Sequence, residues 1–193
     1  MAVIDWDAWR HEYGSMTFAD QQRFYADVAV AHPCQQNFDL PHARETFDRI
    51  EGDRLSVVEL GGWDGALAEA MLDRDDIATW TNYDIVGVPQ VCRREDYRLE
   101  VLDDYLWNKG QVHGDVFVAC HTIEHLTAAE LEWLFDALHV EYIYLQAPIG
   151  KESGQTWGGY VGSHILEIGW DRIDELLAER GYRVVGPNLW RLT

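Results

Sequence analysis

The chain after Gly52 alternates short apolar runs with segments whose apolar residues recur at helical spacing. A strand-then-helix order of this kind is typical of a mostly parallel sheet. The apolar runs are nearly continuous, as expected for strands that helices cover on both faces. The runs predict strands over residues 55–60, 77–86, 97–104, 115–120 and 142–149, with helices over 65–74 and 127–139.

The carboxyl-terminal part departs from this order. Residues 171–180 have the pattern of a helix, and Gly181 is a typical stop signal. Two short apolar segments follow, over 182–185 and 188–192, and a Gly186-Pro187 turn separates them, which predicts an antiparallel pair. The whole pattern predicts an α/β fold with a mostly parallel seven-stranded sheet, helices on both faces and an antiparallel last strand.

The first 52 residues have a different pattern. Apolar residues at helical spacing, among them Phe18, Tyr25 and Val28, predict two or three helices. Pro41 is well placed in the first turn of one of them. We therefore expect an N-terminal helical extension or cap over 1–52 and an α/β domain over 53–193.

The composition narrows the function classes. With 47% hydrophobic and 25% charged residues, the 193-residue chain is an ordinary globular sequence. Its formal net charge of -19 repels phosphate backbones and anionic lipid surfaces. A strongly acidic surface can also simply keep the protein in solution or reflect a host with a high salt concentration. We therefore expect no nucleic-acid partner and no membrane partner.

The cysteines and the termini point to a compartment. Cys34, Cys92 and Cys120 are too few and too scattered for a disulfide framework. The amino terminus lacks a basic patch followed by an apolar run, and no stretch approaches the roughly 20 apolar residues of a membrane span. We expect a cytoplasmic protein, and the sequence leaves a homodimer open.

The segment after the first predicted strand carries the clearest chemical signal. The strand ends in Glu59, and a turn containing Gly61, Gly62 and Gly65 leads into a helix. Glycines there let the backbone bend sharply and let a ligand approach the chain closely. A dinucleotide-binding GxGxxG pattern would need glycine at 63 and 66, where this chain has tryptophan and alanine, so nicotinamide and flavin dinucleotides are disfavoured.

This segment resembles motif I of the class I S-adenosylmethionine (SAM)-dependent methyltransferases, an acid followed by alternating glycines. Glu59, Gly61 and Gly65 are in register, and Trp63 replaces the middle glycine. Asp84, at the end of the second strand, matches motif II, whose acid accepts hydrogen bonds from the ribose hydroxyls. The resemblance covers roughly Leu55 to the carboxyl terminus and implies a Rossmann-like SAM-binding domain.

Further site residues follow from this resemblance. Asp103 or Asp104, at the end of the third strand, is placed to accept a hydrogen bond from the adenine amino group. The fourth strand ends in CHTIEHL, which is similar to the ending found in small-molecule methyltransferases. The residues expected to bind SAM are Glu59, Gly61, Gly62, Trp63, Gly65, Asp84, Ile85, Asp103, Asp104, Cys120 and His121.

The histidines after the fourth strand allow three interpretations. The string of His121, Glu124 and His125 matches an inverted zinc-protease motif, which requires a helix. Glu124, His125 and His164 also resemble the Mg²⁺/Mn²⁺ pattern of small-RNA terminal 2′-O-methyltransferases, which have glutamate where this chain has His121; the metal therefore stays open. We favour proton handling by His121, His125 and His164, because histidine titrates near neutrality and strand ends line the ligand crevice.

The sequence thus predicts a SAM-dependent methyltransferase that acts on a small molecule, by O-methylation of a sugar or natural-product intermediate. A long glycine-containing segment with Lys151, Gln155, Trp157 and Tyr160 is expected to close over the acceptor. Two alternatives remain: a SAM-binding pseudoenzyme that serves as an interaction protein, and a nucleic-acid (RNA 2′-O) methyltransferase.

Overall fold

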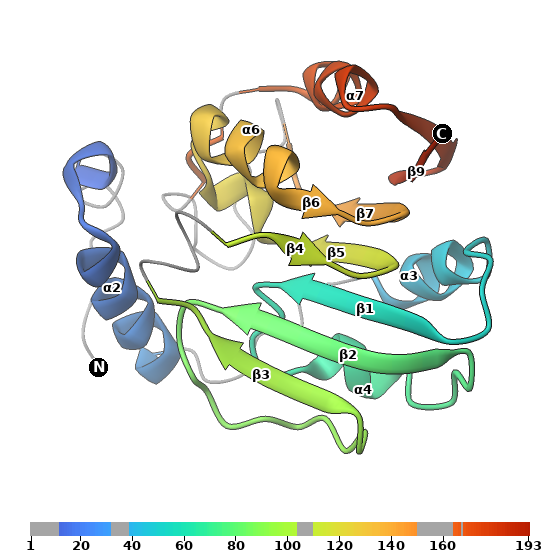
Figure 1. The fold of residues 1–193 in the computed structure, drawn as a ribbon. Helices are drawn as coiled ribbons and strands as arrows, with labels where there is room; N and C mark the ends of the chain where they lie inside the picture. The colour runs from blue at the N-terminus through green and yellow to red at the C-terminus, as the bar shows by residue number, and fades with distance from the viewer. Residues whose placement is uncertain (1–11, 32–38, 104–109, 150–163, 167) are drawn as a thin grey trace.

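The computed structural model describes residues 12–31, 39–103, 110–149, 164–166 and 168–193 (Figure 1). The predicted Lys151–Tyr160 segment and Asp104 lie outside these residues. The helices are η1 (Tyr13–Ser15), α2 (Phe18–Ala31), α3 (Leu40–Phe47), α4 (Ala66–Ala70), η2 (Ile123–His125), α6 (Ala128–Ala137) and α7 (Trp170–Glu179). The strands are β1 (Leu55–Leu60), β2 (Ile77–Asp84), β3 (Tyr97–Val101), β4 (Val112–His113), β5 (Val116–Cys120), β6 (Leu138–His139), β7 (Tyr142–Gln146), β8 (Tyr182–Gly186) and β9 (Leu189–Leu192).

Seven of these strands form one sheet in the order β3-β2-β1-β5-β7-β9-β8. Strands β3, β2, β1, β5 and β7 pair in parallel, and β9 runs antiparallel to both of its neighbours. The predicted seven-stranded, mostly parallel sheet with an antiparallel last strand is therefore confirmed. The last strand, β9, is antiparallel because it follows β8 through a hairpin at Asn188, whose positive φ of 54° lets the chain reverse.

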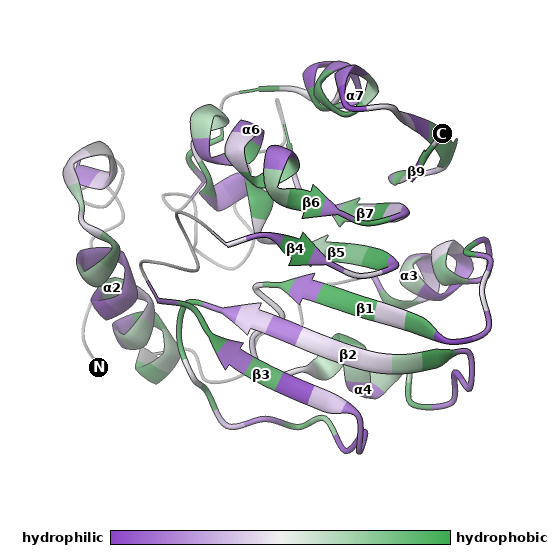
Figure 2. Cartoon of the chain, in the orientation of Figure 1, coloured by the Kyte–Doolittle hydropathy of each residue, from purple (hydrophilic) through white to green (hydrophobic). Residues whose placement is uncertain are grey.

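Helices cover both faces of the sheet, as predicted, and each face has its own apolar core. On one face, α3 and α4 pack through Phe47, Leu67 and Met71 against the buried Trp80 and Tyr144. On the other face, α6 and α7 pack against Phe117 and Ile143 of the central strands. Figure 2 shows the hydrophobic residues concentrated in the central strands. In the edge strand β3, hydrophobic and hydrophilic residues alternate.

Two local features differ from the sequence prediction. The helix expected over 65–74 is only the five-residue α4, because the chain must turn back toward β2, which begins at Ile77, and Arg74 ties this turn to Asp48 and Asp76. The pair β4 and β6 was not predicted: each has two residues, too few to show an alternating pattern.

Within the first 52 residues, α2 and α3 occupy different places. Helix α3 begins at the Asp39 N-cap with Pro41 in its first turn and lies on the sheet. Helix α2 lies beyond the arrowheads of the parallel strands (Figure 1), where the Gln22 amide donates a hydrogen bond to the carbonyl of Ile85. A boundary at residue 52 stays a prediction. No helix in the described parts of the chain is long and apolar enough to cross a membrane.

Candidate active site

The topology of the sheet places a switch point between the carboxyl ends of β1 and β5. The chain adds β2 and β3 on one side of β1 and then returns to add β5 and β7 on the other side. The connections after β1 and β5 therefore leave toward opposite sides of the sheet. Ligands of open α/β sheets bind at such a switch point, and both sequence signals, the glycines after β1 and the histidines after β5, lie there.

The turn after β1 needs its glycines for internal reasons as well as for a ligand. Gly61 and Gly65 have φ of 70° and 75°, which favours glycine. A Cβ at Gly61 would overlap the Thr122 side chain, and one at Gly65 would come within 2.7 Å of the Tyr97 hydroxyl. Trp63 also has a positive φ, 51°, so the residue that replaces the middle glycine of the motif keeps a left-handed backbone.

Strand β2 holds this turn through its side chains. Asn82 accepts a hydrogen bond from the Gly62 backbone N–H at 2.9 Å, and Asp84 accepts one from the Trp63 N–H at 2.9 Å. The Asn82 amide also donates to the Tyr97 hydroxyl at 3.1 Å. Sequence analysis missed Asn82 and Tyr97 as supports of the turn. The available signal was a polar amide inside an apolar strand, which must find partners when buried.

Two buried acids lie beside the turn. Glu59, 1% exposed, accepts a hydrogen bond from the Trp80 indole N–H at 2.8 Å, so it supports the turn from within the core. Asp84, 2% exposed, also accepts from the Val86 N–H at 3.1 Å. Desolvation by burial raises the pKa of Glu59 to about 7 and the pKa of Asp84 to about 6.

The remaining predicted cofactor residues lie along the same edge of the sheet. Ile85 follows Asp84 directly and is half-buried. Asp103 is exposed just beyond the end of β3, next to Leu102, whose N–H donates to the carbonyl of Asp84. Cys120 ends β5, and burial raises the pKa of its thiol well above the usual value. The Trp63 indole nitrogen is buried and has no hydrogen-bond partner among the described residues.

The histidine segment after β5 is fixed by backbone contacts. His121 has a φ of 52°, and its N–H donates to the carbonyl of Gln146 at 2.6 Å. The Thr122 hydroxyl donates to the carbonyl of Leu60 at 2.9 Å and joins this segment to the turn after β1. Only Ile123–His125 are helical, as the single turn η2, so the α-helical spacing that the zinc-protease interpretation requires is absent.

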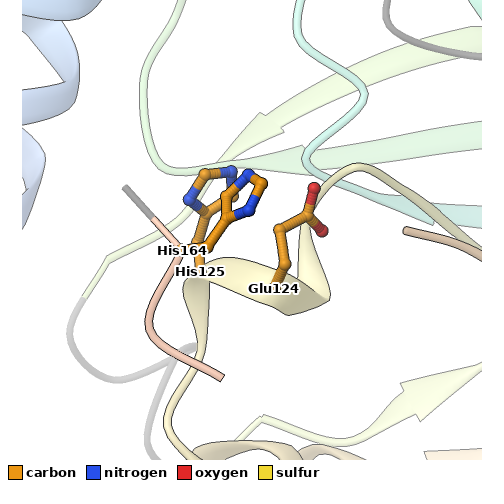
Figure 3. A group of neighbouring side chains, drawn as sticks. All are labelled: Glu124, His125 and His164. Atoms are coloured by element: carbon orange, nitrogen blue, oxygen red, sulfur yellow. The ribbon is translucent and has the colours of Figure 1, made fainter. Parts of the chain in front are cut away.

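Three side chains converge at this corner (Figure 3). Glu124 and His125 project from η2, and His164 comes from a segment whose next two residues, Ile165 and Leu166, donate backbone N–H hydrogen bonds to the Glu124 carbonyl at 2.8 and 3.1 Å. One potential ligand atom from each of the three side chains lies within 4.8 Å of the other two. The structure thus brings His125 and His164 together, with ring centroids 5.3 Å apart.

Two further residues border this corner. The Nδ1 atom of His121 lies 3.3 Å from Oε1 of Glu124, on the side of the turn after β1. The ring of Tyr25, from α2, meets the ring of His125 edge-on at 6.3 Å. Burial, then the charges of Glu124 and Asp84, raise the pKa of Tyr25, so this residue lies within electrostatic reach of both halves of the site.

The comparisons with known proteins agree with the fold. No protein-family model matches the sequence, and no curated protein matches it. Many solved structures do match, and methyltransferases recur among them. The chain has the fold of SAM-dependent methyltransferases, as its motif I resemblance implied.

Three of these solved structures illustrate the kinds of methyltransferase that the chain resembles in fold. A chain from the complex between the Haloferax volcanii Trm112 methyltransferase activator and a methyltransferase has a TM-score of 0.57 and 16% identity, over 96% of this chain and 80% of that one. The methyltransferase domain of bacterial CtHen1 has a TM-score of 0.55 and 16% identity, over 78% and 94%. CalO1, a methyltransferase of calicheamicin biosynthesis in its S-adenosylhomocysteine-bound form, has a TM-score of 0.57 and 15% identity, over 98% and 61%.

Proposed function

We propose that this chain transfers the methyl group of S-adenosylmethionine to a hydroxyl oxygen of a small molecule. The observation that carries the proposal is the switch point of the sheet, where a glycine turn with left-handed backbone lies beside a buried acid at the end of β2. The likeness of the fold to methyltransferases supports it, one of them with S-adenosylhomocysteine bound.

The chemistry of the described residues suits an adenosyl ligand. Asp84 uses one hydrogen bond from Trp63 and one from Val86, and a carboxylate has about four acceptor positions. The remaining positions suit the two ribose hydroxyls. Asp103 offers an acceptor for the adenine amino group, and the free indole N–H of Trp63 offers a donor at the turn.

The cofactor would supply a methyl carbon bound to a cationic sulfur, which leaves as a neutral thioether when a nucleophile takes the methyl group. The chain's own residues then have three tasks: to position the acceptor, to exclude water and to accept the acceptor's proton. His121 and His125 follow β5 at the other side of the switch point, His164 lies beside His125, and we assign the last task to this group. The ring of Tyr25, from α2, meets the ring of His125.

We propose a sugar or natural-product intermediate as the acceptor. The net charge of -19 opposes binding of a nucleic acid, since a polyanion gains affinity mainly by neutralising its phosphates. The fold likeness to a methyltransferase of calicheamicin biosynthesis supports an acceptor of this class.

Two measurements test the proposal in turn. Calorimetry with S-adenosylhomocysteine should detect binding of one ligand per chain, and SAM should compete for the same site. A panel of hydroxylated sugars and aromatic metabolites is then screened for release of S-adenosylhomocysteine from SAM. Absence of binding at millimolar ligand would refute the cofactor assignment, whereas binding without turnover for every acceptor would favour the pseudoenzyme.

A further inference from the structure

The corner formed by Glu124, His125 and His164 contains a buried carboxylate that lacks hydrogen bonds. Glu124 is 1% exposed, and neither of its carboxylate oxygens has a hydrogen-bond partner among the described residues. A buried carboxylate without such partners costs several kcal/mol, so native structures normally pair it with a cation or hydrogen-bond donors. Nδ1 of His121 lies 3.3 Å from Oε1 of Glu124 without a hydrogen bond, and a bound cation would compensate the charge more fully.

Two side chains next to Glu124 are of the kind that binds metal ions. His125 and His164 each place a ring nitrogen within 4.8 Å of a Glu124 oxygen and of each other. Metal bonds of about 2.1 Å place ligand atoms about 3 to 4 Å apart, so modest rotations of the two half-buried imidazoles would complete the coordination. Figure 3 shows the two rings side by side, next to the Glu124 side chain.

The backbone fixes the distance between the two chain segments. The hydrogen bonds from Ile165 and Leu166 to the carbonyl of Glu124 attach the His164 segment to η2. Ile123 and Leu166 are buried in the core beneath, at 0% and 3% exposure. A site with prepositioned ligands loses little conformational freedom when an ion binds, which favours binding.

We propose that Glu124, His125 and His164 bind a divalent transition-metal ion. Two imidazoles and one carboxylate suit Mn²⁺, Fe²⁺, Co²⁺ or Zn²⁺ better than Mg²⁺ or Ca²⁺, which favour oxygen ligands. Three protein ligands leave at least one coordination position open, as in catalytic rather than structural zinc sites.

The open position gives the ion a role that rests on the proposed function. An acceptor hydroxyl bound there would have a lowered pKa and would release its proton to solvent water more readily before it takes the methyl group. In this arrangement His125 and His164 would hold the ion instead of accepting the proton.

Metal binding is measured on the full chain after treatment with a chelator. Calorimetry with MnCl₂ and ZnCl₂, and electron paramagnetic resonance of Mn²⁺, should show one ion per chain. Glu124→Gln, His125→Ala and His164→Ala should each weaken binding at least about tenfold, as expected for loss of a group that holds a metal. His121→Ala should change it much less.

The matched control addresses a second pair of histidines. His113 and His139 are exposed and stack 4.9 Å apart on β4 and β6, so they are an alternative surface site for a transition metal. A His113→Ala/His139→Ala variant should bind the ion with unchanged affinity. Circular dichroism and the unfolding temperature of each variant separate loss of a ligand from loss of the fold.

The outcomes distinguish this site from the proposed function. Metal binding that is lost in the three corner variants but kept in the control supports the site, even if SAM does not bind. The site is overturned if the chelated protein binds neither ion, or if the Glu124, His125 and His164 variants bind as the unmodified protein does. Binding of S-adenosylhomocysteine to Glu124→Gln, measured in parallel, tests the cofactor site separately.

Discussion

The buried acids on the two sides of the switch point have opposite environments. On the side of the glycine turn, Glu59 accepts a hydrogen bond from Trp80, and Asp84 accepts from two backbone N–H groups. On the side of the histidines, Glu124 is equally buried and has no hydrogen-bond partner among the described residues, although Nδ1 of His121 lies 3.3 Å away. The protein itself supplies hydrogen bonds to the acids of the first side, whereas the acid of the second side has room for a further partner.

This difference suggests different tasks for the two sides: the glycine turn positions the cofactor, and the histidine side binds the groups that take part in the reaction. A turn whose backbone is already hydrogen-bonded can hold a cofactor without reorganisation, which favours affinity. A carboxylate without partners stores an electrostatic cost that a cation or substrate can relieve on binding.

The largest effect is expected from Gly61→Ala. The new Cβ would be held at a φ of 70° and would overlap the Thr122 side chain. Strain in the left-handed region and overpacking together should lower the free energy of unfolding by about 3 kcal/mol. Urea unfolding measures this loss. Gly169→Ala is the matched control, because its Cβ would have no neighbour within 4 Å, and equal losses in both variants would contradict the assigned role of the turn.

Trp80→Phe should leave Glu59 without its hydrogen-bond donor, so that Glu59 resembles Glu124. The change removes the indole N–H that Glu59 accepts and leaves a small cavity beside Phe47, on which Trp80 stacks. We expect a loss of about 2 kcal/mol in the free energy of unfolding. Trp170→Phe, at a half-buried indole that stacks on Trp190, should cost less. A Trp80→Phe protein as stable as its parent would mean that Glu59 does not need its partner.

Asp84→Asn tests the cofactor side directly. The NH₂ group that replaces one carboxylate oxygen donates hydrogen bonds and cannot accept them, and the side chain loses its charge. Affinity for S-adenosylhomocysteine should fall about 10- to 100-fold, equivalent to about 1.4 to 2.7 kcal/mol, as measured by calorimetry. Asp75→Asn, at an exposed position at the amino end of β2, should leave the affinity unchanged. Equal affinities in the two variants would exclude a ribose contact by Asp84.

The pH dependence of binding and of stability should have opposite signs. The pKa of Asp84 is raised to about 6, so at pH 5 only about one tenth of the protein carries the ionised form that accepts from the ribose, and cofactor affinity should fall about tenfold. Because the pKa values of Glu59 and Asp84 are raised on folding, the folded state binds more protons than the unfolded state between about pH 4 and pH 7.

The free protein should therefore lose stability as the pH rises through this window, while it gains cofactor affinity. Calorimetric titrations and urea unfolding at pH 5, 6 and 7.5 measure the two trends. Affinity for S-adenosylhomocysteine that does not change over this range would rule out Asp84 as the ribose acceptor.

The sequence predicted the sheet and the glycine turn after its first strand because both depend on local patterns. The apolar run over 55–60 became β1 with the same bounds, and Gly61 and Gly65 have the left-handed backbone that their residue type favours. The resemblance also led to Asp84, which lies beside the turn. Strand periodicity and glycine placement are properties of adjacent residues, and a single sequence records them fully.

The supports of the site were not predictable in this way. Asn82 reaches Gly62 across 20 positions, and the His164 segment reaches Glu124 across about 40, so neither pairing has a local pattern. Tyr25 could be seen only as one of several aromatic residues of α2, and its approach to His125 depends on how that helix lies against the sheet. Whether Glu124 is paired depends on the packing of three separate segments.

The smallest effect is expected from Glu124→Gln, and its sign depends on the metal. In the chelated protein, the variant removes a buried charge that has no hydrogen-bond partner among the described residues, and it should leave the unfolding temperature unchanged or raise it, by the equivalent of about 1 kcal/mol. Addition of MnCl₂ should raise the unfolding temperature of the unmodified protein, because an ion that binds only the folded state stabilises it, and should hardly change that of the variant. Differential scanning calorimetry with and without the ion measures both effects. If Glu124→Gln instead destabilises the chelated protein by several kcal/mol, the carboxylate has a stabilising partner within the chain, and the contrast between Glu124 and the acids beside the glycine turn disappears.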